Sequence, residues 1–297
     1  MKKRLLMLAL LGHALAAQAA HAGTHRHHLK VDDALSHPKT HKTPLLRVQS
    51  HIALIYDEQD RRPLYNKNSE TVVPIASITK LMTAMVMLDA RLPMDEAVSV
   101  EEDELNRIRR AKSRLRVGMT LTRSEMLKLA LMASENRAAL ALARSYPGGP
   151  AAMVAAMNAK ARVLGMQNTR FFDPTGLDSD NVSTAQDLVK MVAAARLYPL
   201  IHQYTTSTSH SVEGLRGRPV RFSNTNPLVR NASWDIGVSK TGYISEAGLC
   251  LVMEAKIKQR PVIIVLLDSW GKHTRVGDAN RIKKWMEKVS FQDSQRS

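Results

Sequence analysis

A serine and a lysine three residues apart form the first pair in this sequence that could carry out nucleophilic chemistry. Ser77 and Lys80 enclose Ile78 and Thr79 where an apolar, helix-like segment begins. On a helix such residues are neighbours, with Cβ atoms ~5–6 Å apart. A serine hydroxyl needs a base, and a lysine serves only when burial or another cation lowers its pKa. We predict Ser77 as nucleophile and Lys80 as base, with the Ser77 N–H at the helix start as one oxyanion donor.

Spacing alone is weak support for this pair, because Ser-x-x-Lys recurs by chance in a chain of this length. One further copy, at 36–39, contains a proline, and another, at 269–272, contains a glycine and follows a strand-like run. Neither opens a helix at its serine. Only Ser77 lies where the chemistry requires it.

A second candidate group, Ser134-Glu135-Asn136, falls between two expected helices. From a loop there, Ser134 could pass a proton to a leaving amine and Asn136 could hold the substrate backbone. Helix capping explains the same residues equally well. A similar Ser-x-Asn at 179–181 lies in a turn-rich stretch, and we interpret it as a loop and cap.

A third group, Lys240-Thr241-Gly242, is expected to end a strand that begins near Ile236. Lys240 could attract a carboxylate and depress the pKa of Lys80, and Thr241 could hydrogen-bond the same carboxylate. Gly242 would leave room for a substrate along the strand. The Tyr243 N–H would be the second oxyanion donor. The alternative is an ordinary strand-to-turn junction.

Hydrophobic periodicity predicts strands at both ends of the chain and helices between them. Two capped helix starts are expected, from Thr122 with Glu125 and from Thr184 with Asp187. The order of elements predicts one antiparallel sheet made from both ends and covered by helices, an α+β fold. The strands are expected at 51–56, 63–66, 236–240, 249–257 and 262–267, and the helices at 77–90, 122–131, 137–145, 151–164, 184–197 and 275–288.

The three motifs in this order resemble the signature of penicillin-binding proteins and serine β-lactamases. Ser134 follows Ser77 by 57 residues and precedes Lys240 by 106. Stretches 74–80, 113–118, 171–177 and 240–253 resemble the D-alanyl-D-alanine peptidases. Ser-Glu-Asn with Lys-Thr-Gly-Tyr is most similar to the D-alanyl-D-alanine endopeptidases of the penicillin-binding protein seven type. The resemblance covers roughly residues 45–290 and implies a β-lactamase/transpeptidase-like fold, with a mostly helical lobe and the site between two lobes.

The resemblance implies a reaction, namely hydrolysis of the D-alanyl–meso-diaminopimelyl cross-link of peptidoglycan through a Ser77 acyl-enzyme. Ser77 and Tyr243 N–H groups would hold the oxyanion, and Lys240 with Thr241 the carboxylate beside the scissile amide. A D-alanyl-D-alanine carboxypeptidase would use the same groups and remains an alternative. The chain ends soon after the last helix, which favours the endopeptidase branch. The family needs no metal or organic cofactor, and β-lactams are expected to acylate Ser77.

Two other classes are less well supported. A class A β-lactamase needs a glutamate between the second and third motifs to activate water. Glu213 is the only glutamate from 137 to 240, and it lies in a Gly- and Arg-rich stretch, so β-lactam acyl-enzymes should be long-lived. A non-catalytic wall-binding protein would not require the three motifs.

The N-terminus has the pattern of a secretory signal peptide. A basic start at 1–4 precedes an apolar run at 5–17, and Ala20-His21-Ala22 is a cleavage sequence before Gly23. We expect a signal peptide at 1–22, a flexible leader at 23–46, one peptidase domain at 47–290 and a tail at 291–297, with the mature protein in the periplasm. The leader's His25, His27 and His28 could bind a metal opportunistically, but no specific site is predicted.

Composition constrains the partners. The net charge of +16 suggests an anionic partner, and export argues against nucleic acid, as does the 4% aromatic content. We therefore expect contact with the cell wall and peripheral association with anionic membrane. Cys250 is the only cysteine and lies in an apolar run, so we expect a buried, inert thiol.

Overall fold

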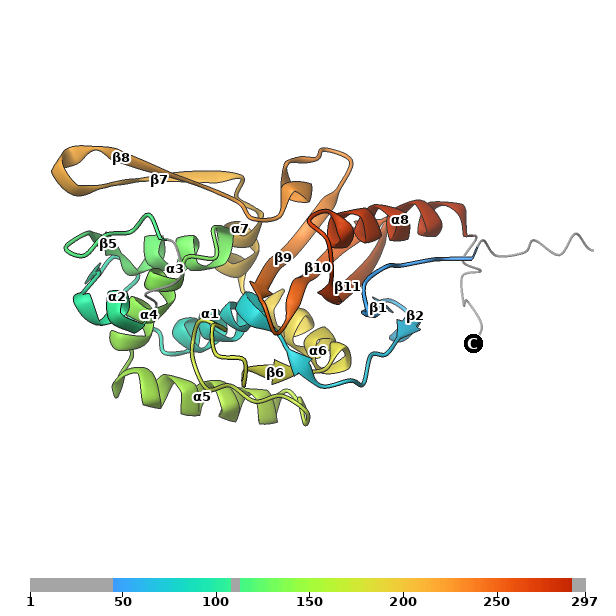
Figure 1. Ribbon diagram of the computed structural model, residues 1–297, viewed down its shortest axis with the longest axis horizontal. Coiled ribbons are helices and arrows are strands. Elements are labelled where there is room, and N and C mark those ends of the chain that lie inside the picture. Colours follow the sequence, from blue (N-terminus) through green and yellow to red (C-terminus); the bar gives the residue numbers. More distant parts are fainter. Residues whose placement is uncertain (1–44, 108–112, 290–297) are drawn as a thin grey trace, which may run out of the picture. The chain divides into compact units, whose positions relative to one another are not determined.

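The computed structural model describes residues 45–107 and 113–289, all within one compact unit of the chain (Figure 1). The expected signal peptide, the histidine-containing leader up to residue 44 and the C-terminal tail lie outside the described residues.

A five-stranded antiparallel sheet is the framework of the fold (Figure 1). Its strand order is β2-β1-β11-β10-β9, so the first hairpin pairs with the last strand: Ile52 lies opposite Leu267. The prediction of one antiparallel sheet drawn from both ends of the chain is confirmed. The strands are β1 (Ile52–Asp57), β2 (Arg62–Lys67), β9 (Asp235–Ile244), β10 (Gly248–Ile257) and β11 (Arg260–Ser269).

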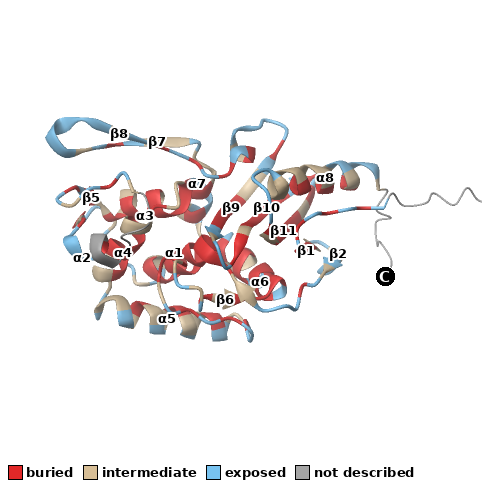
Figure 2. Ribbon diagram, in the orientation of Figure 1, coloured by how far each residue is buried: buried red, intermediate tan, exposed pale blue. Residues whose placement is uncertain are grey.

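Both faces of the sheet are covered, which explains the nearly continuous apolar runs of its central strands. Successive side chains of a strand point to opposite faces. Ile55, Met253 and Ile264 pack with Ile282 of α8 (Thr274–Lys288) on one face. The other face faces the larger core, which includes α6 (Ala185–Ala195) (Figure 2).

The middle of the chain is helical, as predicted, and surrounds one deeply buried helix, α1 (Lys80–Asp89). Figure 2 shows α1 and the faces of α3 and α4 directed toward it as buried. The remaining helices are α2 (Glu102–Arg107), α3 (Arg123–Met132), α4 (Asn136–Arg144), α5 (Gly149–Val163) and α7 (Pro199–Thr206). No helix in the described ranges is long and apolar enough to cross a membrane.

Two helix starts were predicted from capping residues. Thr122 and Glu125 form the expected capping box at α3, where each side chain accepts from the other residue's backbone N–H. Thr184 caps α6 by accepting from the Asp187 N–H at 3.1 Å. The predicted second bond, from the Thr184 N–H to the Asp187 carboxylate, is not formed. That carboxylate accepts instead from the Asn168 N–H and the Thr169 hydroxyl.

Several short elements were not predicted. Two-residue and three-residue strands pair as β3 (Val73–Pro74) with β6 (Val182–Ser183) and β4 (Ala97–Ser99) with β5 (Thr120–Thr122), too short for a period-2 pattern. A longer hairpin, β7 (Ser209–Glu213) and β8 (Pro219–Ser223), stands on the helical part of the fold with most of its residues exposed (Figures 1 and 2). Only Val212 and Phe222 are fully buried in it.

Candidate active site

Ser77 lies in a tight turn and not in an α-helix. Residues Ala76–Thr79 form a 3₁₀ turn, η1, and the regular helix begins at Lys80, so the predicted helical start at residue 77 is corrected. Ala76 has a φ of 47°, which is unusual for a residue with a Cβ. The junction nevertheless brings the predicted pair together, with Lys80 Nζ 2.9 Å from Ser77 Oγ.

Lys80 is fully surrounded by protein. Its Nζ lies 2.7 Å from Asn136 Oδ1 and 2.7 Å from the Thr175 carbonyl oxygen. Burial lowers the pKa of Lys80 to about 7, although Asp173 and Glu135 act in the opposite direction. A lysine with that pKa is partly neutral near pH 7, and a neutral amine can accept the proton of a serine hydroxyl.

A second lysine, Lys240, contacts the serine of the second motif, Ser134. Ser134 lies between α3 and α4 in the left-handed region, with a φ of 58°, and Lys240 Nζ lies 2.8 Å from its Oγ. Lys240 also donates to the Thr241 carbonyl at 2.8 Å. Burial holds its pKa well below the usual value, and the charges of Lys80 and Arg275 lower it further. Burial is the main cause of the lowered pKa of both lysines, and the effect of Lys240 on Lys80 stays a prediction.

The Lys-Thr-Gly group lies inside β9 and not at its end. The strand continues to Ile244, so the predicted boundary at Lys240 is wrong by four residues. β9 is an edge strand of the sheet, with β10 on one side only. Thr241 Oγ1 donates to Thr225 Oγ1 at 2.6 Å, and the side chain of Tyr243 is exposed.

Two glycines allow the chain to close around the Ser77 turn. A Cβ on Gly242 would lie 3.0 Å from the Ala76 Cβ and 3.1 Å from the Ser77 nitrogen. A Cβ on Gly176, which has a φ of 77°, would lie 1.9 Å from the Ala76 carbonyl oxygen. Gly242 was expected to make room for substrate, whereas the neighbour that excludes a side chain there is the turn itself.

The loop behind Lys80 contributes residues that sequence reasoning missed. Asp173 accepts from the Gly176 N–H and from Asn181 Nδ2, both at 2.8 Å. Asn181 also donates to Thr79 Oγ1 at 3.1 Å and is fully buried. These bonds hold the Thr175 carbonyl against Lys80. Asn181 lies in a loop, as predicted, but the cap of the next helix is Thr184. The turn-forming Asp-Pro-Thr-Gly sequence was the one available signal.

Glu135 has a clear structural role, although it was not predicted as a site residue. It is buried, and its Oε1 accepts from Ser113 Oγ at 2.5 Å and from the Arg114 N–H at 3.1 Å. The carboxylate therefore fastens the 113–114 segment to the loop that carries Ser134. A buried acid needs such donors.

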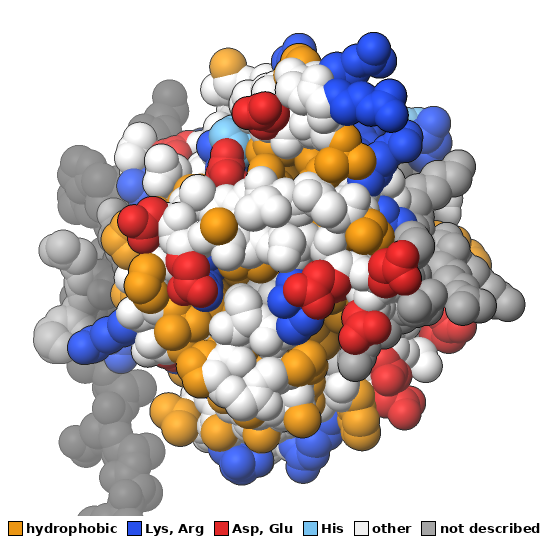
Figure 3. All heavy atoms as spheres, turned by 90° about the vertical axis from the view of Figure 1, so that its left-hand side faces the viewer, with side chains coloured by type: hydrophobic (Ala, Val, Ile, Leu, Met, Phe, Trp, Pro, Cys, Tyr) orange, Lys and Arg blue, Asp and Glu red, His pale blue; other side chains and the backbone are white. Residues whose placement is uncertain are grey.

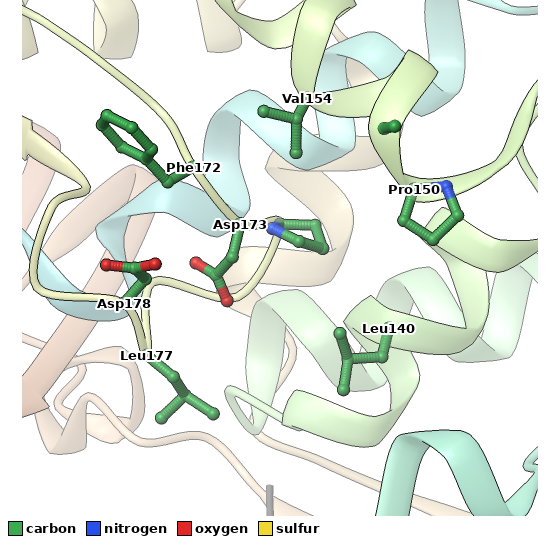
Figure 4. A pocket seen from close by; sticks show the side chains of 9 residues that line it. Leu140, Pro150, Val154, Phe172, Asp173, Leu177 and Asp178 are labelled. Atoms are coloured by element: carbon green, nitrogen blue, oxygen red, sulfur yellow. The ribbon is translucent and has the colours of Figure 1, made fainter. Parts of the chain in front are cut away.

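A cavity next to the 172–178 loop does not contain the predicted site residues. It has a volume of about 790 Å³ and lies between α4, α5 and the 172–178 loop, with Leu140, Val154 and Phe172 in its wall (Figure 4). A smaller hollow of about 490 Å³ includes Ser134 in its wall.

The remaining candidates for chemistry are a thiol and possible metal ligands. Cys250 is buried as predicted, and burial raises the pKa of its thiol to about 11. Among residues 45–107 and 113–289, no three His, Cys, Asp or Glu side chains are grouped as metal ligands would be.

Comparisons with known proteins agree with this geometry. A model of the D-alanyl-D-alanine carboxypeptidase family matches residues 37–271. The chain is 50% identical to a D-alanyl-D-alanine endopeptidase of Pseudomonas aeruginosa, over 79% of this chain and 76% of the relative. It is 46% identical to one of Escherichia coli, over 81% and 78%. The crystal structure of a Streptomyces DD-transpeptidase has a TM-score of 0.74 at 26% identity, covering 80% of this chain and 97% of that one.

Proposed function

The chain belongs to the D-alanyl-D-alanine carboxypeptidase family, and on that premise we propose that it is a serine endopeptidase of peptidoglycan cross-links. Its substrate would be the D-alanyl–meso-diaminopimelyl bond between two stem peptides. The observation that carries the proposal is the 2.9 Å contact between Ser77 Oγ and the amine of Lys80, whose pKa is about 7.

Acylation begins with proton transfer from Ser77 to neutral Lys80. The Ser77 oxygen attacks the D-alanyl carbonyl carbon, and the N–H groups of Ser77 and Tyr243 stabilise the oxyanion. Asn136 holds the substrate backbone while its Oδ1 keeps Lys80 in place. With a pKa of about 7, part of the Lys80 population is already neutral near pH 7, and that form can take the Ser77 proton directly.

Departure of the leaving half requires a proton on its nitrogen. Ser134 Oγ, in contact with Lys240 at 2.8 Å, can donate that proton and be reprotonated from the lysine side. Lys240 and Thr241 bind the carboxylate next to the scissile amide, and the negative charge of that carboxylate favours the protonated form of Lys240. That carboxylate is present on terminal D-alanine and on the D-centre of meso-diaminopimelate alike, so these groups serve either leaving half.

Hydrolysis of the acyl-enzyme returns Ser77. Lys80 is the base positioned to activate water, and Glu213 is unsuited to that role because it is an exposed residue at the end of β7. A β-lactam that acylates Ser77 should therefore leave slowly, and the protein should bind penicillin covalently.

Endopeptidase activity is favoured over carboxypeptidase activity by similarity and not by catalytic chemistry. The two relatives named above are called endopeptidases, while the family model carries the carboxypeptidase name. A non-catalytic wall-binding role would leave the Ser77–Lys80 and Ser134–Lys240 contacts without a purpose.

The deciding experiment gives the purified protein a cross-linked muropeptide dimer and an uncross-linked pentapeptide. Conversion of dimer to monomers with little free D-alanine supports the proposal. Rapid D-alanine release with intact dimer would overturn it and leave a carboxypeptidase. A labelled-penicillin gel separates both from a non-catalytic protein, which would remain unlabelled.

We also propose that the protein acts in the periplasm, with residues 1–22 removed and only peripheral contact with anionic membrane. The mass of the periplasmic protein should correspond to a start at Gly23, and an intact Met1 would contradict export. Membrane association should weaken as salt is added, because salt shortens the Debye length and so screens the charges. Retention in high salt would contradict an electrostatic contact.

A further inference from the structure

A hollow of about 490 Å³ has Ser134 in its wall. Ser134 is the residue proposed to protonate the leaving half of the substrate, so the hollow lies where that half would depart. Three segments form its walls: 113–114, 133–135 and the 222–225 stretch that includes the end of β8. Ser134 and Thr225 are wall residues, and their hydroxyls contact Lys240 Nζ and Thr241 Oγ1. A group that leaves past Ser134, with its carboxylate at Lys240 and Thr241, enters this hollow next.

The exposed charge around the hollow is positive. Arg114 lines it with an exposed side chain, and one guanidinium nitrogen donates to the Arg221 carbonyl oxygen, a bond that uses one of five N–H donors. Exposed Arg221 lies on β8, while exposed Arg216, Arg218 and Glu213 lie at or beside the hairpin turn, outside the wall of the hollow. Figure 3 shows Lys and Arg side chains gathered at the top of this end. The acidic wall residue, Glu135, is already bound to Ser113 and the Arg114 N–H.

The hairpin also presents backbone groups to the hollow. Asn224 N donates to Thr208 O at 2.9 Å, so the adjacent pair, Ser209 and Ser223, is a non-hydrogen-bonded pair of the β7–β8 ladder. The N–H and C=O of Ser223 therefore point toward the free edge of β8. The Arg221 carbonyl, on the same edge, is the one that receives the Arg114 bond.

The two possible substrates differ in what would fill this space. Terminal D-alanine ends at the carboxylate that Lys240 and Thr241 attract. The leaving half of a cross-link continues as a peptide arm with further carboxylates, on its D-glutamate and at its terminal D-alanine. A cationic hollow with free backbone donors and acceptors complements that arm and has no counterpart in free D-alanine.

We propose that this hollow is the subsite for the leaving stem peptide and that Arg114 is its specificity-determining residue, through an ion pair with a carboxylate of the peptide arm. The inference rests on the proposed endopeptidase function and deepens it. It locates the preference for a cross-link outside the Ser77–Lys80–Ser134 machinery, in the 113–114 segment and β8.

The test compares Arg114→Gln with the wild-type protein. Glutamine removes the charge but keeps N–H donors for the Arg221 carbonyl. We expect kcat/KM for the cross-linked dimer to fall roughly tenfold, mainly through KM, as for loss of one charge-assisted contact. The rate of labelling by penicillin, which has no leaving stem peptide, should be unchanged. Arg114→Lys should restore most of the dimer activity, and exposed Arg116→Gln, on the same segment, is the matched control.

A second substrate isolates the charge. A dimer amidated only at the carboxylates of the leaving peptide arm, with the carboxylate beside the scissile amide left free, should be cleaved more slowly by the wild type and equally by wild type and Arg114→Gln. If Arg114→Gln cleaves the ordinary dimer as fast as the wild type, the subsite is wrong and the endopeptidase proposal stands. If penicillin labelling falls as much as dimer cleavage, Arg114 only supports the Glu135 loop and the subsite is again wrong. If the wild type leaves the dimer intact, both proposals fail.

Discussion

Two regions of this protein bury a cationic side chain, and the pKa of that side chain is raised in one region and lowered in the other. At the start of β11, Arg260 bonds Asp57 and Asp60, and these carboxylates raise its pKa although burial opposes them. At the active site, Lys80 donates to the neutral oxygens of Ser77, Asn136 and Thr175, and burial lowers its pKa to about 7.

The difference reflects both the type of cation and its partners. Arg260 keeps its proton as any guanidinium does, and its two carboxylates fasten the β1–β2 turn to β11. A cation given only neutral acceptors loses its proton easily and becomes a base. Asp173 and Glu135 lie near enough to raise the pKa of Lys80, but each is bonded to backbone N–H groups instead. The predictions below test that division.

The largest effect is expected from the catalytic pair. Ser77→Ala should abolish covalent penicillin labelling, and Lys80→Ala should slow it by about 10⁴-fold or more, because nucleophile and base act as a unit. The double variant should be little worse than either single one. Labelling rates and circular dichroism measure chemistry and folding separately. Persistent labelling of Ser77→Ala would place the nucleophile elsewhere.

Substitution of Arg260, which is paired with carboxylates, should change stability and not catalysis. Arg260→Met leaves buried Asp57 uncompensated and should lower the free energy of unfolding by about 3 kcal/mol in a urea titration, with penicillin labelling unaffected at low urea. Arg62→Met is the matched control, since Arg62 contacts Asp60 from an exposed position and should matter little. An unchanged urea midpoint for Arg260→Met would remove the contrast between the regions.

The rate of the reaction that depends on Lys80 should change with pH. The penicillin acylation rate should fall about tenfold per pH unit below the Lys80 pKa of about 7, because only the neutral amine accepts the Ser77 proton. Its pKa is lower in the folded protein than the ordinary 10.5, so the unfolded chain binds the extra proton between these values and stability rises with pH across that window. Lys80→Met should flatten that rise. A rate independent of pH from 5 to 8 would contradict a titrating base.

The smallest effect concerns Glu135. Its negative charge raises the pKa of Lys80, so Glu135→Gln should move the ascending limb of the pH–rate profile to lower pH by a fraction of a unit. Glutamine keeps an oxygen that can accept from Ser113, so folding should persist. A shift to higher pH would mean that the variant changes the burial of Lys80 and not its electrostatics.

The sequence was sufficient to predict those parts of the fold and site that depend on the types of side chains and their spacing. The three motifs were predicted as neighbours because the chemistry needs a nucleophile, a base and carboxylate-binding groups together, and Lys80 does contact Ser77 and Asn136. Strands and helices followed from apolar periodicity. The catalytic roles themselves stay predictions until they are tested.

What was missed depends on backbone atoms and on close approach. The Thr175 carbonyl is a partner of Lys80, and any residue type supplies a carbonyl, so no letter of the sequence marks it. The contact of Gly176 with the Ala76 carbonyl joins residues 100 positions apart. The β7–β8 hairpin was missed because only Val212 and Phe222 of its strands are fully buried, which leaves little apolar alternation.

The pairing of β1 with β11 affects when the fold can form during synthesis. Ile52 can find Leu267 only after more than two hundred intervening residues have been made. Lys240 likewise reaches Ser134 across 106 residues. Contacts so remote along the chain form late, since loop closure must precede them. A growing chain therefore holds Ser77 and Lys80 before the strand that carries Lys240 exists, and the complete site forms only when synthesis is nearly finished.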